Sequence, residues 1–228
     1  MRIDIQDYGY LFQQMLGTKN NSGTVNPLKV SDLTNGSLGA QLIASGINTN
    51  SAQYKAAVNE MTKHPGSGSM FTNVQAIKNL MSHYDKDGDY IDPTTGLAGL
   101  LVTEENANSR NKLISIPESS RDDMFELTKR EFLQNNGIRD GDTTKRSDVY
   151  TELYQKMSKS DRLPAGYTLE QYERAYTKAL VTAAKAADPT WKAGKPVQTG
   201  ALDAVTREAV ESTLIKSGDK LVRDKLNN

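Results

Sequence analysis

Apolar side chains recur three or four positions apart along most of this 228-residue chain, and no run of strand length alternates with period two. This spacing gathers apolar side chains on one face of a helix, whereas a half-buried strand needs strict alternation. Glycine, proline, serine and asparagine divide the chain into six to eight such segments. The sequence therefore predicts an all-α fold, an irregular multi-helix bundle with at most one small β-hairpin.

The bounds of the expected helices follow from residues that cap or break a helix. The expected segments are 38–44, a helix from Asn50 or Ser51 to 63, one opening at Thr72 or Asn73, one from Ser119 or Ser120 to 137, then 144–158, 168–187 and 201–226. Thr168 and Gln171 have capping-box spacing, and Gly218 is an expected break. Residues 113–117 should be extended, because the residue before Pro117 avoids the helical region.

Charge is unevenly distributed and suggests two parts. Residues 1–80 carry only 10 of the 56 charged residues and are instead rich in serine, threonine, asparagine, glutamine and glycine. We expect residues 1–48 to form a polar N-terminal arm with a short amphipathic helix, and residues 49–228 to form a helical domain. The apolar face of that short helix would dock on this chain or on a protein partner; it consists of Tyr8, Leu11, Phe12, Met15 and Leu16.

Composition limits the class of protein. The 28 basic and 28 acidic residues balance, which argues against a general binder of nucleic acid, since such a protein needs a basic surplus. No apolar run is long enough to span a membrane, and the acidic start is unlike a Sec signal. There is no cysteine, so disulfides and thiolate sites are excluded. The sequence permits either a cytoplasmic protein or one exported without a Sec signal, for instance by a flagellar-type route.

The densest group of acidic residues is Asp85, Asp87, Asp89 and Asp92, which lies after a predicted helix. Oxygen ligands at alternate positions suit Ca²⁺, and the run resembles an EF-hand loop. Neither register of that loop fits: a loop starting at Asp85 has Tyr90 where the turn glycine belongs, and a loop with Gly88 at that position has His83 at position 1 and Thr94 at position 12. Two interpretations stay open: a solvated Asp-Gly turn with Gly88 at positive φ, or an irregular calcium site formed by the four aspartates.

Other candidate sites have simpler explanations. His64 and His83 are the only histidines, and the sequence has no Gly-x-Ser-x-Gly elbow, so no catalytic residue is predicted. The loop at residues 66–69 lacks the Lys-Ser/Thr of a Walker motif, so no nucleotide cofactor is predicted either. Paired carboxylates such as Asp122 and Asp123 are expected on solvated helix faces.

The aromatic residues are interpreted mainly as packing residues. Tyr150 and Tyr154 are four residues apart, as are Tyr172 and Tyr176, so each pair shares a helix face. Trp191, the single tryptophan, lies between two predicted helices, where it is expected to fill their junction. A ligand platform for the tyrosines and a contact surface at Trp191 are the alternatives.

Three blocks of sequence have a familiar pattern: residues 73–81 running into 84–89, residues 141–150, and residues 171–176. Together they resemble a family of bacterial proteins that is known as a domain of unknown function. The resemblance covers most of residues 40–225. It implies a bacterial origin, and it implies no activity, cofactor or catalytic residue.

These observations favour a non-enzymatic structural or protein-interaction protein, with calcium at the acidic loop as its one candidate cofactor. The N-terminal helix is the expected contact with a protein partner. The alternative is a carboxylate-dependent hydrolase that acts on a glycan, which would require two acids about 5–10 Å apart in a cleft, one with a raised pKa.

Overall fold

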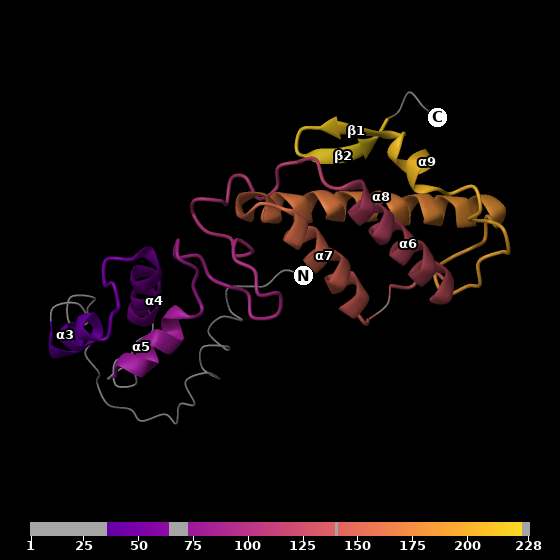
Figure 1. Ribbon diagram of the computed structural model, residues 1–228. Helices are drawn as coiled ribbons and strands as arrows, with labels where there is room; N and C mark the ends of the chain where they lie inside the picture. The colour runs from indigo at the N-terminus through magenta and orange to yellow at the C-terminus, as the bar shows by residue number, and fades with distance from the viewer. Residues whose placement is uncertain (1–35, 64–72, 140, 225–228) are drawn as a thin grey trace. The chain divides into compact units, whose positions relative to one another are not determined.

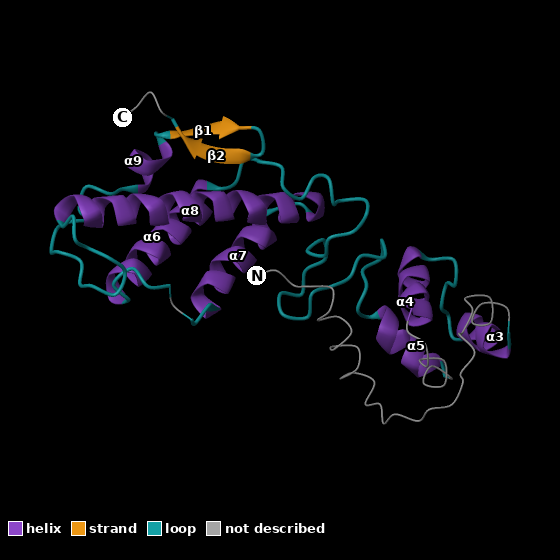
Figure 2. Ribbon diagram, turned by 180° about the vertical axis from the view of Figure 1, so that it is seen from behind, coloured by secondary structure: helices purple, strands orange, loops and turns teal. Residues whose placement is uncertain are grey.

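The computed structural model describes residues 36–63, 73–139 and 141–224, and all structural statements below concern these residues. The chain divides into two compact units, Met1–Ile91 and Asp92–Asn228. The described residues form seven α-helices, one short 3-10 helix and one two-stranded hairpin (Figures 1 and 2). The predicted all-α class, with at most one small hairpin, is confirmed.

The described part of the first unit consists of three helices: α3 (Ser37–Ala44), α4 (Ala52–Lys63) and α5 (Val74–Met81). Two of the predicted caps are present. The Ser51 hydroxyl accepts a hydrogen bond from the Tyr54 amide at 3.2 Å, and the Asn73 side chain accepts one from the Ala76 amide at 2.9 Å. Each satisfies one of the amides that a helix leaves unpaired at its start.

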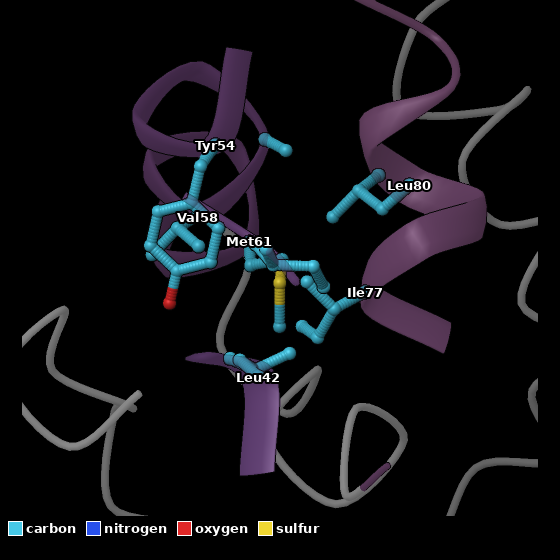
Figure 3. Close-up of a cluster of buried hydrophobic side chains, with 8 residues drawn as sticks. Leu42, Tyr54, Val58, Met61, Ile77 and Leu80 are labelled. Atoms are coloured by element: carbon cyan, nitrogen blue, oxygen red, sulfur yellow. The ribbon is translucent and has the colours of Figure 1, made fainter. Parts of the chain in front are cut away.

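A small apolar core joins these three helices. Figure 3 shows side chains from each helix converging on one cluster, namely Leu42, Tyr54, Val58, Met61, Ile77 and Leu80. Leu42 and Ile47 both belong to this core, so residues 36–48 pack with the helices that follow them. Residues 1–35, which include the predicted amphipathic helix, lie outside the described residues.

The second unit is built around one long helix. Its elements are α6 (Glu118–Gln134), α7 (Thr144–Lys156), the 3-10 helix η2 (Lys159–Asp161), α8 (Arg162–Ala187), α9 (Arg207–Glu211), β1 (Leu214–Ser217) and β2 (Lys220–Arg223). Helices α6 and α7 cross one side of α8, while α9 and the hairpin lie along another side (Figures 1 and 2). Helix α8 thereby contributes to both apolar clusters of this unit, through Leu169 and Tyr176 in one and Leu180 and Ala184 in the other.

The predicted start of α8 at Thr168 is wrong, because the helix begins six residues earlier at Arg162. Proline fits the first turn of a helix, where its missing amide proton has no partner to lose, and Pro164 occupies this position. Thr168 is buried inside the helix, and its hydroxyl donates to the Pro164 carbonyl at 2.8 Å. The capping-box spacing was therefore coincidental.

The start of α6 also differs from the prediction. Pro117 occupies the N-cap position, so Ser119 and Ser120 lie in the first turn instead of capping it. Residues 113–117 lie outside any helix, as the proline predicted. The helix ends at Gln134, three residues before the expected end at Gly137.

The predicted helix at residues 201–226 is wrong. Only Arg207–Glu211 is helical, and the following residues form the antiparallel hairpin, in which Ser217 pairs with Lys220. Gly218 has a φ of +62°, which suits the first position of a two-residue hairpin turn. The apolar residues near this turn occur on both strands, and their spacing was misread as a helical stripe.

Trp191 fills the junction that the sequence predicted. Its ring is buried against Phe132 at a centroid distance of 5.5 Å, and its indole nitrogen donates to the Lys195 carbonyl at 3.0 Å. Gly137 lies directly against this ring: a Cβ atom at residue 137 would lie 2.7 Å from the indole. Gly137 also has a φ of +77°, so two independent constraints exclude a side chain there.

We predict that Gly137→Ala lowers the free energy of unfolding by about 2–4 kcal/mol, because it adds left-handed strain to an overlap with a rigid ring. Gly200→Ala is the matched control, since Gly200 also has a positive φ (+81°) but an added Cβ would make only ordinary contacts there. Chemical denaturation of both variants measures the difference. Equal destabilisation by the two substitutions would contradict the packing described for Trp191.

Candidate functional site

The acidic turn after α5 is shaped by its own backbone. One carboxylate oxygen of Asp85 accepts hydrogen bonds from the amides of Asp87 and Asp89, both at 2.9 Å. Gly88 has a φ of +89°, and Tyr84 and Tyr90 form a bridge across the turn. This is the arrangement expected of an Asp-Gly turn, in which a carboxylate stands in for a backbone acceptor.

Asp92 begins the second unit and shapes a turn of its own. One of its oxygens accepts hydrogen bonds from the amides of Thr94 and Thr95, at 2.9 and 2.8 Å. Within residues 36–63, 73–139 and 141–224, no three acidic or histidine side chains are grouped so that they could hold a metal ion. The turn interpretation explains Asp85 and Asp92 without a ligand, and calcium binding by Asp85, Asp87, Asp89 and Asp92 stays a prediction.

A different group of charged residues is buried in the second unit. Arg146 of α7 contacts Glu131 of α6 through Nη2 at 2.7 Å and Glu173 of α8 through Nε at 3.1 Å. The exposed fractions of the three side chains are 9% for Arg146 and 10% for each glutamate. One guanidinium therefore links three helices from a position that is largely shielded from water.

Two further groups approach Glu173 from the edge of this cluster. Arg139, which is 71% exposed, contacts one carboxylate oxygen at 3.5 Å, and the Tyr150 hydroxyl approaches the other at 3.5 Å. Burial raises the pKa of Tyr150 well above its usual value, and the nearby charge of Glu173 raises it further. The phenol therefore stays protonated and can donate to the carboxylate throughout the physiological range.

Arg146 has hydrogen-bonding capacity that the protein does not use. Its Nη1 atom is buried and has no hydrogen-bond partner among the described residues, and its Nε contact with Glu173 is an ion pair without hydrogen-bond geometry. A guanidinium carries five N–H donors in a fixed fork, and a buried donor without an acceptor is unfavourable. The cluster thus contains a buried, positively charged donor whose hydrogen-bonding capacity is unused.

These residues line an open groove with a volume of about 650 Å³. Its walls are α6, residues 137–139, Arg146 of α7, and the face of α8 from Glu173 to Lys185; we call it the Arg146 groove. Its lining holds five cationic side chains and two acidic ones. The cationic residues are Arg139, Arg146, Arg174, Lys178 and Lys185, and the acidic residues are Glu131 and Glu173.

The groove brings two carboxylates to one guanidinium, whereas the hydrolase alternative requires two acids about 5–10 Å apart, one with a raised pKa. Both Glu131 and Glu173, however, are engaged in ion pairs with Arg146. A general acid must instead hold its proton until the substrate is protonated. The lining contains no histidine, and the Thr128 hydroxyl donates to the Met124 carbonyl.

A second buried arginine, Arg207, joins other parts of the same unit. It contacts Glu118 and Asp122 of α6, and it pairs with Glu211 of α9 at 3.1 Å. Glu211 also accepts a hydrogen bond of 2.5 Å from the Tyr176 hydroxyl of α8. Nε of Arg207 lacks a hydrogen bond but forms an ion pair with Asp122, and the other contacts join α6, α8 and α9, so we assign this cluster a structural role.

The sequence analysis did not identify Arg146, Glu131 or Glu173, although a signal was present. Arg146 precedes Val149, Leu153 and Met157 at helical spacing, so a charged residue occupies the inward face of α7. Glu173 stands between Leu169 and Tyr176 on the inward face of α8 in the same way. Charged residues on an apolar stripe are expected to be paired, and this could have indicated the cluster.

The described residues thus form a mostly helical protein with an open groove whose lining is mainly cationic. The chain belongs to the family described as Domain of unknown function (DUF3879), whose model matches residues 47–227. Comparison with curated proteins and with solved structures finds no match. No helix in the described ranges combines the length and the apolarity needed to cross a membrane.

We predict that Arg146→Met lowers the free energy of unfolding by about 3–5 kcal/mol, because it leaves Glu131 without its counter-charge and leaves Glu173 with only the long contact to the exposed Arg139. Arg174→Met is the matched control: Arg174 is exposed and pairs with Glu170 one turn away, so its loss should cost about 0.5 kcal/mol or less. Urea denaturation at neutral pH measures both. If adding Glu131→Gln and Glu173→Gln to Arg146→Met recovers no stability, the buried charges are not the cause.

The partly buried Tyr154 of α7 leads to a prediction for alkaline pH. Burial raises the pKa of Tyr154 to about 12, with contributions from the charges of Glu170 and Asp92. An unfolded tyrosine ionises near pH 10, so between about pH 10 and 12 the unfolded chain has lost a proton that the folded chain keeps. The free energy of unfolding should therefore fall as the pH rises through this window. Tyr154→Phe should make this fall shallower by up to about 1.4 kcal/mol per pH unit, as measured by denaturation at several pH values; an unchanged slope would contradict the burial.

Proposed function

We propose that this chain is a non-enzymatic protein-interaction protein whose binding surface is the Arg146 groove. The observation that carries the proposal is the buried guanidinium of Arg146, which contacts both carboxylates of the groove and keeps one donor, Nη1, without a partner. A site arranged for hydrolysis would leave at least one carboxylate free to exchange protons. Here both carboxylates fix the position of the arginine instead.

The dimensions of the groove also support binding. Its volume of about 650 Å³ lies within the range of ligand sites in proteins, which is about 300–1,000 Å³. Apolar and charged groups occur side by side in its lining. Ile138 is 56% exposed and lies next to Arg139, and Val181 lies between Lys178 and Lys185 on α8. Such a mixture of apolar contact and polar orientation is typical of surfaces that recognise another chain.

The proposal is tested with a photo-crosslinking amino acid placed at Thr182, an exposed position in the groove lining. The matched control carries the same group at Lys216, an exposed residue of β1 outside this lining. We expect a discrete protein adduct from residue 182 and none from residue 216 when the chain is produced in its own cells. The adduct is identified by mass spectrometry, and the partner is then purified.

Calorimetry with the purified partner completes this test. Thr182→Arg should weaken its binding at least about tenfold, because a bulky cation then occupies the groove, while Lys216→Arg should leave binding unchanged. Equal binding by both variants would contradict the assignment of the groove as the binding surface.

The hydrolase alternative makes the opposite prediction. If Glu131 and Glu173 were catalytic, the protein would release reducing sugars from peptidoglycan or another glycan, and Glu173→Gln would abolish this release. We expect no release above that of the heat-denatured protein. Turnover that is lost in a folded Glu173→Gln variant would replace the interaction proposal with the hydrolase.

Calcium is a separate prediction with its own measurement. Because the Asp85 carboxylate already accepts two amide hydrogen bonds, a cation would have to use its other oxygen together with those of Asp87 and Asp89. A calcium site would raise the melting temperature in millimolar calcium, reversibly with chelator, and Asp87→Asn would reduce the shift. The hydrogen-bonded turn predicts no shift in either protein.

A further inference from the structure

We infer that the partner of the Arg146 groove is an acidic segment of a protein, one carboxylate of which binds to Nη1 of Arg146. This inference rests on the proposed function and adds the chemistry of the ligand. It depends on three features of the described residues: the charge of the lining, the spacing of its cations, and the unused donor at its base.

The charge of the lining favours a negatively charged ligand. Its five cationic side chains exceed its two acidic ones by three, and both acids are already in contact with Arg146. Arg174 is partly neutralised by Glu170 at 2.6 Å. Lys178 and Lys185 have no ion pair among the described residues, so their charges are available to a ligand. A protein with no net charge therefore carries a local positive surface at this groove.

The spacing of the cations sets the length of the segment. Arg174, Lys178 and Lys185 lie along one helix, and at 1.5 Å per residue the first and last are separated by about 16 Å. An extended peptide rises about 3.3 Å per residue, so about five or six residues cover this distance. The exposed side chain of Ile138 and the partly buried Val181 offer apolar contacts along the same path. A short segment with glutamates or aspartates and one or two apolar residues fits these features.

The unused donor of Arg146 gives the segment an anchor. A buried N–H group without an acceptor is unfavourable, and a ligand carboxylate would supply the missing acceptor. A charge-assisted hydrogen bond in a shielded position is stronger than one at the surface. Access requires movement of the side chains at the edge of the groove, and Arg139 is suited to this because it is mostly exposed and its contact with Glu173 is long, at 3.5 Å.

The same features argue against nucleic acid as the ligand. The aromatic residue in the lining, Phe132, is buried against Trp191, so it cannot stack on a base. The chain as a whole has no basic surplus. An acidic peptide needs only the short row of charges that the groove provides.

The test uses the full chain and a peptide of about six residues in which pairs of glutamates alternate with leucine. Trp191 is a native reporter, because it is the single tryptophan and packs on Phe132 and beside Gly137, both of which line the groove. We expect saturable binding by tryptophan fluorescence and calorimetry. Affinity should fall as salt is added and should be at least about tenfold weaker for the same peptide with glutamine in place of glutamate.

Two variants locate the binding. Lys178→Glu combined with Lys185→Glu should abolish binding without loss of folding, because both residues are exposed. The matched control, Lys216→Glu combined with Lys220→Glu, changes the charge equally on the hairpin and should bind as the unmodified protein does. Arg146→Lys keeps the charge but loses the fork of donors, so it should weaken binding where it folds.

Each outcome decides the inference. Equal affinity for the glutamate and glutamine peptides, no binding of either, or tighter binding of a single-stranded oligonucleotide would overturn it. The peptide can fail to bind while Thr182→Arg still weakens binding of the partner crosslinked at residue 182. In that case the groove binds a ligand of another chemistry, and the proposed function survives. Release of reducing sugars from a glycan would contradict both the inference and the proposed function.

Discussion

The second unit depends on how it neutralises charge in its interior. Arg146 contacts Glu131 and Glu173 at one end of α6, and Arg207 contacts Glu118 and Asp122 at the other. Each arginine bridges α6 to other helices, and an unpaired charge at either position would be strongly unfavourable. The two clusters therefore fix α6 at both ends, while apolar packing against α8 fills the length between them.

The two clusters differ in how fully their charged groups are paired. Around Arg207, four carboxylates surround one guanidinium, and the strongest contacts join α6, α8 and α9. Around Arg146, a single guanidinium serves two carboxylates, one of its nitrogens has no partner, and the surrounding surface is cationic. Helix packing is enough to explain the Arg207 cluster. The second cluster leaves Nη1 of Arg146 without a hydrogen-bond partner among the described residues, which is why we propose that the function lies there.

Local signals in the sequence predicted much of the fold. Ser51 and Asn73 cap their helices as expected, Pro117 ends an extended segment, and Trp191 fills a junction. The errors occurred where two local patterns competed, since a threonine with capping-box spacing lay inside α8, and the apolar residues near Gly218 fitted a helix as well as a hairpin. The Arg146 cluster could not be derived, because its three members come from separate helices and only tertiary packing brings them together. The charged residues on apolar helix faces were the only sign of this cluster in the sequence.

The most direct measurement is the NMR signal of the Arg146 side chain in the full-length protein, recorded with and without the glutamate peptide. The account predicts that the guanidinium protons of Arg146 shift on binding, together with the backbone amides of α8 between residues 178 and 185, and that the hairpin at residues 214–223 is unaffected. A binding response confined to the hairpin, or to helices α3–α5, with the Arg146 signal unchanged, would contradict it.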